Sequence, residues 1–176
     1  MKPIAALAGR PAAWKARGAF ARDFDLVAGD ESFATLRWEK AFGSLAAAET
    51  AEGRWTFKRA GFLNPRVTAR VAGSDRDLAT FRPDWGGGGT LVFEHGAAFR
   101  LRSHGFWNPR WVLESPDGAE LVEFRPEGFT RRNAHLEVKP GAAGLPELPV
   151  LVTIGWYLVI LVEEDASAAG AVVATS

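Results

Sequence analysis

The basic side chains in the middle of the chain have the clearest potential for chemistry. Residues 53–132 contain 13 Lys or Arg and nine Asp or Glu, a net charge of +4, whereas residues 133–176 contain one Lys and five acids, a net charge of −4. Guanidinium groups suit phosphorylated or carboxylate ligands, because each can donate two parallel hydrogen bonds to an anion. The candidate ligand-binding residues are Lys58, Arg66, Arg102, Trp107 and Arg110.

Arg66 and Arg110 are the strongest of these candidates, because each directly follows an Asn-Pro dipeptide. Equivalent corners would place both arginines on the same rim of a folded sheet. An anionic lipid headgroup or a protein partner is the expected ligand. The alternative is that these arginines only solvate the outer faces of strands, pair with nearby acids and cover aromatic neighbours with their stems.

Patterns for catalysis, metals and cofactors are weak. His95, His104 and His135 lack the spacing of a zinc-binding helix, and no Gly-x-Ser-x-Gly motif is present. The glycine-rich segment 85–90 leads into the strand-like residues 91–93, whereas a phosphate-binding loop needs a lysine and a following helix. We therefore expect no catalytic residue, no cofactor and no structural metal, and we expect segment 85–90 to be a flexible linker between repeats.

Length and composition indicate one globular domain, residues 1–176. The 21 basic and 21 acidic side chains balance, which argues against a nucleic-acid partner, and 47% of the residues are hydrophobic. The absence of cysteine excludes disulfides and lipidated cysteine anchors. The first residues do not resemble an export signal, so a cytoplasmic location, peripheral to a membrane at most, is the expectation.

An internal repeat organises the middle of the chain. The sequence Gly-Phe-Leu-Asn-Pro-Arg at residues 61–66 recurs as Gly-Phe-Trp-Asn-Pro-Arg at 105–110, a separation of 44. Phe-Arg-Pro-Asp at 81–84 recurs as Phe-Arg-Pro-Glu at 124–127, a separation of 43. These matches define repeat units at about 54–83 and 98–126, and residues 26–37 resemble a degenerate third copy.

The alternation of apolar and polar residues between turn signals predicts short antiparallel strands. The predicted ranges are 20–27, 32–38, 45–50, 54–60, 66–72, 77–82, 90–94, 98–104, 110–115, 119–125 and 129–138. A sheet of this size must close or stack to remove its edges.

The apolar run at 148–162 predicts a helix near the C-terminus. At about 22 Å it would be shorter than the roughly 30 Å hydrocarbon core of a bilayer. A helix that is apolar on every face must be enclosed by protein or lipid. The three acids at 163–165 oppose the helix dipole, so we expect the helix to end there. Gly155 lies in its centre, which is tolerable if a large neighbouring side chain needs the space.

Repeated meanders of aromatic-rich strands that end in an apolar helix resemble the tubby C-terminal-like superfamily, which includes LURP-one-related proteins and phospholipid scramblases. The resemblance covers residues 20–162 and implies a closed antiparallel barrel of about twelve strands around a buried helix at 148–162. It also implies a non-enzymatic binding or scaffold module that recognises an anionic phospholipid or a protein. Two alternatives are a membrane-associated protein anchored by the helix and a small enzyme with an unrecognised site.

Overall fold

The computed structural model describes residues 1–18, 22–40, 42–61, 64–105, 109–127 and 132–173, with side chains to residue 169. The strands are β1 (Pro11–Ala16), β2 (Asp23–Ala28), β3 (Glu31–Trp38), β4 (Ala46–Thr50), β5 (Arg54–Ala60), β6 (Arg66–Val71), β7 (Asp77–Pro83), β8 (Gly89–Phe93), β9 (Ala98–His104), β10 (Arg110–Glu114), β11 (Glu120–Glu127) and β12 (Asn133–Val138). The helical segments are η1 (Ile4–Leu7), η2 (Pro140–Ala142) and α1 (Leu148–Val173).

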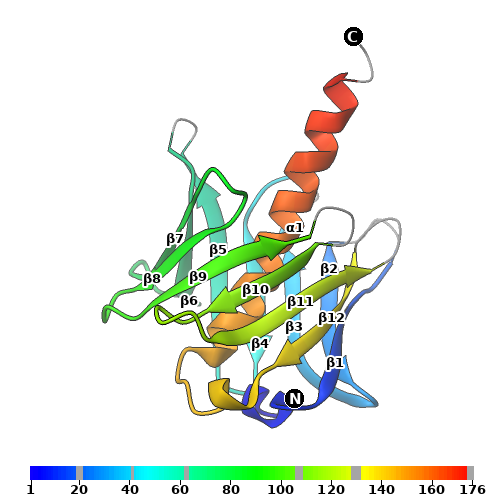
Figure 1. Cartoon of the computed structure of the whole chain (residues 1–176), viewed down its shortest axis with the longest axis vertical. Helices are drawn as coiled ribbons and strands as arrows, with labels where there is room; N and C mark the ends of the chain where they lie inside the picture. The colour runs from blue at the N-terminus through cyan, green and yellow to red at the C-terminus, as the bar shows by residue number, and fades with distance from the viewer. Residues whose placement is uncertain (19–21, 41, 62–63, 106–108, 128–131, 174–176) are drawn as a thin grey trace.

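The strands form one closed antiparallel barrel, which confirms the predicted fold class (Figure 1). Each strand pairs with its neighbours in the sequence, and β1 closes the barrel by pairing with β12. Alternate side chains point inward, as Phe24 and Leu26 do in β2. The predicted ranges omit β1, because Pro11 and the alanines that follow it have weak strand propensity. Pairing with both neighbours supplies what the local sequence lacks.

Helix α1 fills the barrel, and every side chain from residue 148 to residue 161 is buried. The ring of Trp156 stacks between those of Trp14 and Phe124, with 6.5 Å between centroids on each side. A Cβ on Gly155 would lie 2.4 Å from the ring of Phe124. The expected reason for this glycine is therefore confirmed: a large side chain of the barrel occupies the space.

The helix continues to Val173, so the prediction that it ends at residues 163–165 is wrong. Arg22 donates to Glu164 at 2.6 Å and Arg59 donates to Asp165 at 2.6 Å, which offsets the unfavourable interaction of these acids with the helix dipole. The alanines that follow favour helix. Within the described residues, no helix is both long enough and apolar enough to cross a membrane.

The barrel consists of three four-stranded repeats: β1–β4, β5–β8 and β9–β12. The predicted units at 54–83 and 98–126 correspond to β5–β7 and β9–β11. Gly61 and Gly105, 44 residues apart, have φ angles of +87° and +85°. The pairing register shifts after Ala69 in β6 and after Leu113 in β10, again 44 residues apart.

The two ends of the barrel differ. Helix α1 emerges at the end where β1–β2, β3–β4, β5–β6, β7–β8, β9–β10 and β11–β12 connect, which we call the helix-exit end (Figure 1). Segment 85–90 belongs to the β7–β8 hairpin within the middle repeat, so it is not a linker between repeats. Nor is it loose, because Gly88 and Gly89 are buried and neither has room for a Cβ.

Candidate anion-binding site

The predicted basic residues come from four strands of the barrel wall. Lys58 lies on β5, Arg66 on β6, Arg102 on β9 and Arg110 on β10. Each alternates with buried neighbours that face α1, so their side chains point outward. Trp107 lies outside the described residues. Burial, charge and partners distinguish the other four.

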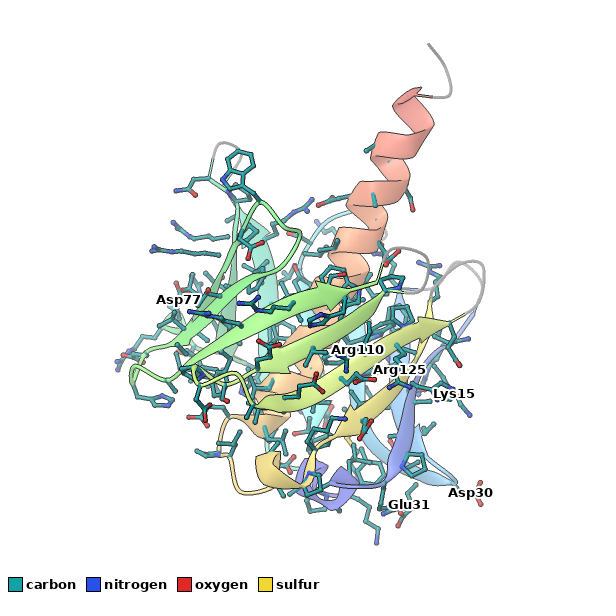
Figure 2. All side chains as sticks on the ribbon, viewed as in Figure 1. Lys15, Asp30, Glu31, Asp77, Arg110 and Arg125 are labelled. Carbon is teal, nitrogen blue, oxygen red and sulfur yellow. The ribbon has the colours of Figure 1, made fainter. Side chains whose placement is uncertain are left out.

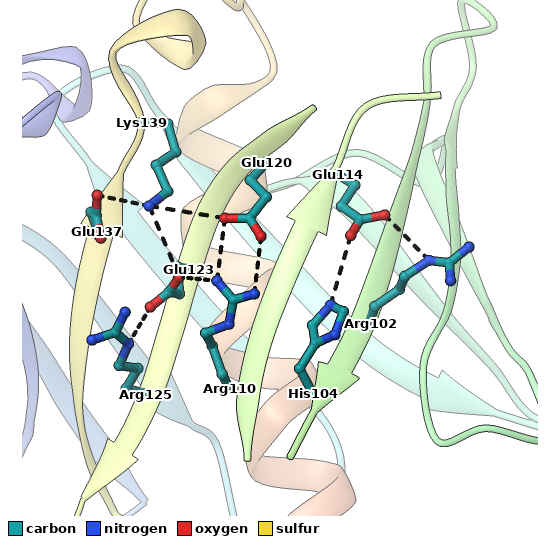
Figure 3. Close-up of polar contacts among 9 residues, drawn as sticks. All are labelled: Arg102, His104, Arg110, Glu114, Glu120, Glu123, Arg125, Glu137 and Lys139. Atoms are coloured by element: carbon teal, nitrogen blue, oxygen red, sulfur yellow. Dashed lines mark hydrogen bonds and ion pairs between the residues drawn. The ribbon is translucent and has the colours of Figure 1, made fainter. Parts of the chain in front are cut away.

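Arg110 is already neutralised by acids of the neighbouring strand. Its guanidinium donates to Glu123 at 2.7 Å and to Glu120 at 3.0 Å (Figure 3). These hydrogen bonds raise the pKa of Arg110. The guanidinium therefore has its carboxylates within the protein, as the alternative interpretation of the sequence expected.

Glu123 is the centre of this network, although its side chain is only 1% exposed. Burial by itself would raise the pKa of Glu123, but hydrogen bonds from Arg110 and Arg125 outweigh burial and hold the pKa below its usual value. Lys139 lies 3.9 Å from Glu123 and pairs with Glu137 at 2.8 Å (Figure 3). With Glu120, three acids and three cations balance on this part of the wall.

Arg102 also has an internal partner. Its Nε lies 3.2 Å from Glu114, a carboxylate that His104 approaches at 3.8 Å (Figure 3). Both side chains come from β9 and share one acid of β10. Arg102 is therefore more available to an external anion than Arg110 is, but less available than a cation that has no acid beside it.

Arg66 and Arg82 lie opposite each other with no such acid. The register pairs Val67 with Phe81, so the next residues toward the helix-exit end, Arg66 and Arg82, are cross-strand neighbours. Both are exposed, and neither forms an ion pair or hydrogen bond with a described residue. Like charges directly opposite each other destabilise a sheet. This pair therefore carries a local cost that an anion between the two guanidinium groups would remove.

The third repeat shows what occupies the equivalent space when the arginines are paired. Arg66 corresponds to Arg110 at a separation of 44, and Arg82 corresponds to Arg125 at a separation of 43. Arg110 and Arg125 lie on adjacent strands of the outer wall (Figure 2). They share the carboxylate of Glu123, and the residue 43 positions before it is Thr80. The middle repeat thus keeps both arginines and lacks their carboxylate.

The first repeat also has an acid at this place, although Asp23 and Arg37 stand where the middle repeat has Arg66 and Arg82. Its cross-strand pair is Asp25 and Thr35, where the middle repeat has Thr68 and Thr80. Arg37 donates to Asp25, and Arg17 donates to the same carboxylate at 2.6 Å. Burial opposes these bonds but does not prevent a lowered pKa at Asp25. Only the middle repeat, among the described residues, has arginines and two threonines in this arrangement without an acid.

We call Arg66, Arg82, Thr68 and Thr80 the middle-repeat site. It continues across the wall through register pairs that place Arg82 beside Thr90 and Thr90 beside Arg100. Arg100 is exposed and has no ion pair with a described residue. A surface hollow of about 710 Å³ touches Thr80, Arg82 and Thr90, and a second of about 490 Å³ touches Thr90 and Arg100.

The acids nearest this part of the wall are already engaged. Asp77 pairs with Arg70 at 2.6 Å, and Glu94 pairs with Arg76. Asp84 accepts hydrogen bonds from two backbone amides of its own loop. Lys58, Arg66, Arg82 and Arg100 have no ion pair with a described residue, so cations exceed the available acids on this described part of the wall. This excess favours an anion from outside the chain.

The histidines do not form a common centre. His95 lies 2.6 Å from Glu147, His135 lies 2.6 Å from Glu127, and His104 shares Glu114 with Arg102. Within the described part of the chain, no group of three or more metal-ligating side chains lies together. No serine or threonine hydroxyl of a described residue hydrogen-bonds to these histidines.

Comparison with known proteins found no matching family model, curated protein or solved structure.

The candidate residues predicted from the sequence include Arg66 and Lys58 but neither Arg82 nor the two threonines. The repeat contains a signal that could have found two of them. Aligning Ala-Thr-Phe-Arg at 79–82 with Val-Glu-Phe-Arg at 122–125 shows an arginine retained and an acid replaced. Arg100 could be placed only once the register of β8 and β9 was known.

Proposed function

We propose that this barrel is a non-enzymatic binding module whose middle-repeat site takes a phosphate group. The observation that carries the proposal is the comparison of repeats. In the third repeat, two arginines share a carboxylate. In the middle repeat, the two equivalent arginines have threonines beside them and no carboxylate. A bound phosphate would supply the missing negative charge. It would also relieve the repulsion between Arg66 and Arg82.

The chemistry of the site favours phosphate over a single carboxylate. Guanidinium groups bind phosphate oxygens in a bidentate manner, and threonine hydroxyls can donate to the oxygens that remain. Lys58 and Arg100 add positive charge on either side, which suits a group of charge near −2. A phospholipid headgroup and a free phosphate ester both offer this chemistry. The architecture fits what the tubby-like resemblance implies, and membership of that superfamily stays a prediction.

Restoring the missing carboxylate tests the proposal. In Thr80→Glu the new side chain should pair with Arg66 and Arg82 as Glu123 pairs with their counterparts. The melting temperature of the parent should rise with added glycerol phosphate, because a ligand that binds only the folded state stabilises it. Thr80→Glu should melt higher than the parent without ligand and show no further rise. A parent indifferent to glycerol phosphate and to anionic vesicles would contradict the proposal.

The source of the phosphate is distinguished by a second pair of variants. Arg66→Ala with Arg82→Ala should weaken flotation with anionic vesicles about 25-fold, because each arginine near such a surface contributes about 1 kcal/mol. Arg10→Ala with Arg54→Ala makes the same change in charge at exposed, paired arginines away from the middle-repeat site and should have little effect. Binding should also fall as salt rises. If soluble glycerol phosphate binds and vesicles do not, the ligand is a free phosphate ester.

A further inference from the structure

Trp85 differs from the other tryptophans of the chain in its environment. Its side chain is fully exposed in the β7–β8 loop. The five other tryptophans with described placement are buried: Trp14, Trp38, Trp55, Trp111 and Trp156. A large aromatic side chain held wholly in water loses the hydrophobic stabilisation that burial would provide, so its exposure needs a reason.

The loop that carries Trp85 is an ordered structure. The carboxylate of Asp84 accepts hydrogen bonds from the amides of Gly86 at 2.9 Å and Gly88 at 3.2 Å. The amide of Asp84 donates to the carbonyl of Gly88 at 3.0 Å. Gly87 has a φ of +81°, and a Cβ on Gly88 would lie 2.2 Å from the carbonyl oxygen of Leu101. These contacts fix a tight hairpin that presents Trp85 at its tip.

The tip lies next to the unpaired cations. Arg82 is three residues before Trp85, and the last register pairs before the loop are Arg82 with Thr90 and Pro83 with Gly89. Beyond the barrel, α1 leans away from the β7–β8 hairpin, which leaves this part of the wall open (Figure 1). An aromatic tip beside guanidinium groups complements an anionic bilayer, where aromatic side chains occupy the interface and arginines meet headgroup phosphates.

We infer that the barrel docks on an anionic bilayer with the β6–β9 wall facing the lipid and Trp85 inserted among the headgroups. This inference depends on the proposed function, because the middle-repeat site supplies the contact with lipid phosphates. Phe42 also lies exposed at the helix-exit end, but it belongs to the β3–β4 connection, and strands β4 and β5 separate that connection from the β6–β9 wall. In this orientation, Phe42 therefore does not contact the lipid.

The cysteine-free sequence allows a direct measurement of insertion. Gly86→Cys places one label beside an intact Trp85, and its Cβ would meet only the Asp84 side chain, at 3.3 Å. Asp30→Cys is the matched control, since Asp30 lies in an exposed turn at the opposite end of the barrel (Figure 2). With phosphatidylcholine vesicles containing phosphatidylserine, nitrobenzoxadiazole at position 86 should brighten and shift to the blue. The same dye at position 30 should not change.

Two alanine variants complete the test. Trp85→Ala should weaken vesicle binding about tenfold, the loss expected for one large apolar side chain. Phe42→Ala should change it by less than about twofold, because binding follows the apolar area that enters the lipid. Equal losses of vesicle binding in both variants would overturn the orientation in which the β6–β9 wall faces the lipid. Binding that survives Trp85→Ala with an unchanged label at position 86 would overturn insertion and leave the phosphate site standing. Vesicle binding that needs Trp85 but is unchanged by Arg66→Ala with Arg82→Ala would overturn the proposed function.

Discussion

At positions 80 and 123, one side chain decides whether two arginines are satisfied inside the protein or face solvent unpaired. Glu123 reaches both arginines because it lies two residues from Arg125 on β11, on the same face of the sheet, and close to Arg110 on β10. Thr80 occupies the equivalent position in β7, but its side chain is short and uncharged and cannot pair with arginines. The chemical difference between repeats is therefore a change of one residue type within an otherwise retained arrangement.

Glu123→Gln should make the protein less stable at neutral pH and less sensitive to acid. The folded-state pKa of Glu123 lies below its ordinary value of 4.5, so its contribution is fully present above pH 4.5 and is lost as the pH falls through the folded pKa. Removing the charge should cost about 2 kcal/mol near neutral pH. Urea unfolding from about pH 7 down to about pH 3 measures the difference, which should shrink in acid.

Glu137→Gln is the matched control, because Glu137 lies directly opposite Glu123 on β12 but is half exposed and has its ion pair with Lys139. Its effect should stay below about 1 kcal/mol. A deficit in Glu123→Gln that persists unchanged in acid would show that altered packing, and not the charge, is responsible.

Sequence reasoning at this scale could identify residue types but not their partners. Arg66 and Arg110 each follow an Asn-Pro dipeptide, so the sequence alone predicts the same role for both. Their difference depends on residues 14 and 13 positions later, Thr80 and Glu123, which come close only through strand register. The pattern of the sequence does not contain that register, because a bulge in each repeat shifts it.

Among the elements, the existence of α1 is the feature that the sequence predicts best, and the position of its C-terminal end is the one that it predicts worst. The apolar run and the fold resemblance both indicated an enclosed helix beginning at Leu148, and burial through Leu161 confirms it. The extension to Val173 depends on Arg22 and Arg59, which come from distant strands and cannot be assigned to α1 from sequence. Strand β1 was missed for a similar reason, since its stability comes from two partners.

Gly155→Ala should destabilise the protein even though alanine favours helix. The propensity gain is about 1 kcal/mol, whereas forcing a methyl group against Phe124 and Leu113 should cost about 1–3 kcal/mol or more. Thermal unfolding measures the net loss. Adding Phe124→Leu to Gly155→Ala should recover part of it, and a double-mutant cycle with no coupling between the two positions would contradict the packing argument.

At the scale of the whole molecule, three repeats of similar structure form the barrel wall, but their outward-facing side chains differ in charge. The sequence predicted the barrel because alternation, turns and repetition all pointed to the same closed sheet. It could not predict the wall's charge distribution, because acids pair with Arg37 in the first repeat and with Arg110 and Arg125 in the third, whereas Arg66 and Arg82 of the middle repeat have no ion pair with a described residue. A net charge of zero therefore conceals a strongly uneven surface.

Truncation should show that the barrel depends on its helix. A chain that ends after Glu147 loses the whole buried segment of α1, so it should show no cooperative unfolding transition in urea. A chain that ends after Ser167 retains every helix residue that is buried among those with described side chains, and it should lose no more than about 1 kcal/mol. Native-like, cooperative unfolding of the shorter chain would mean that the strands can form a core without α1.

The place of α1 in chain order also governs when the protein can fold. During synthesis, all twelve strands emerge before the segment that occupies their interior, and the first strand waits for the twelfth before the wall can close. Domains that complete their core early can begin to fold while synthesis continues, but this barrel exposes its apolar inner face until α1 has been made. We therefore expect the twelve strands to need protection from aggregation before α1 emerges.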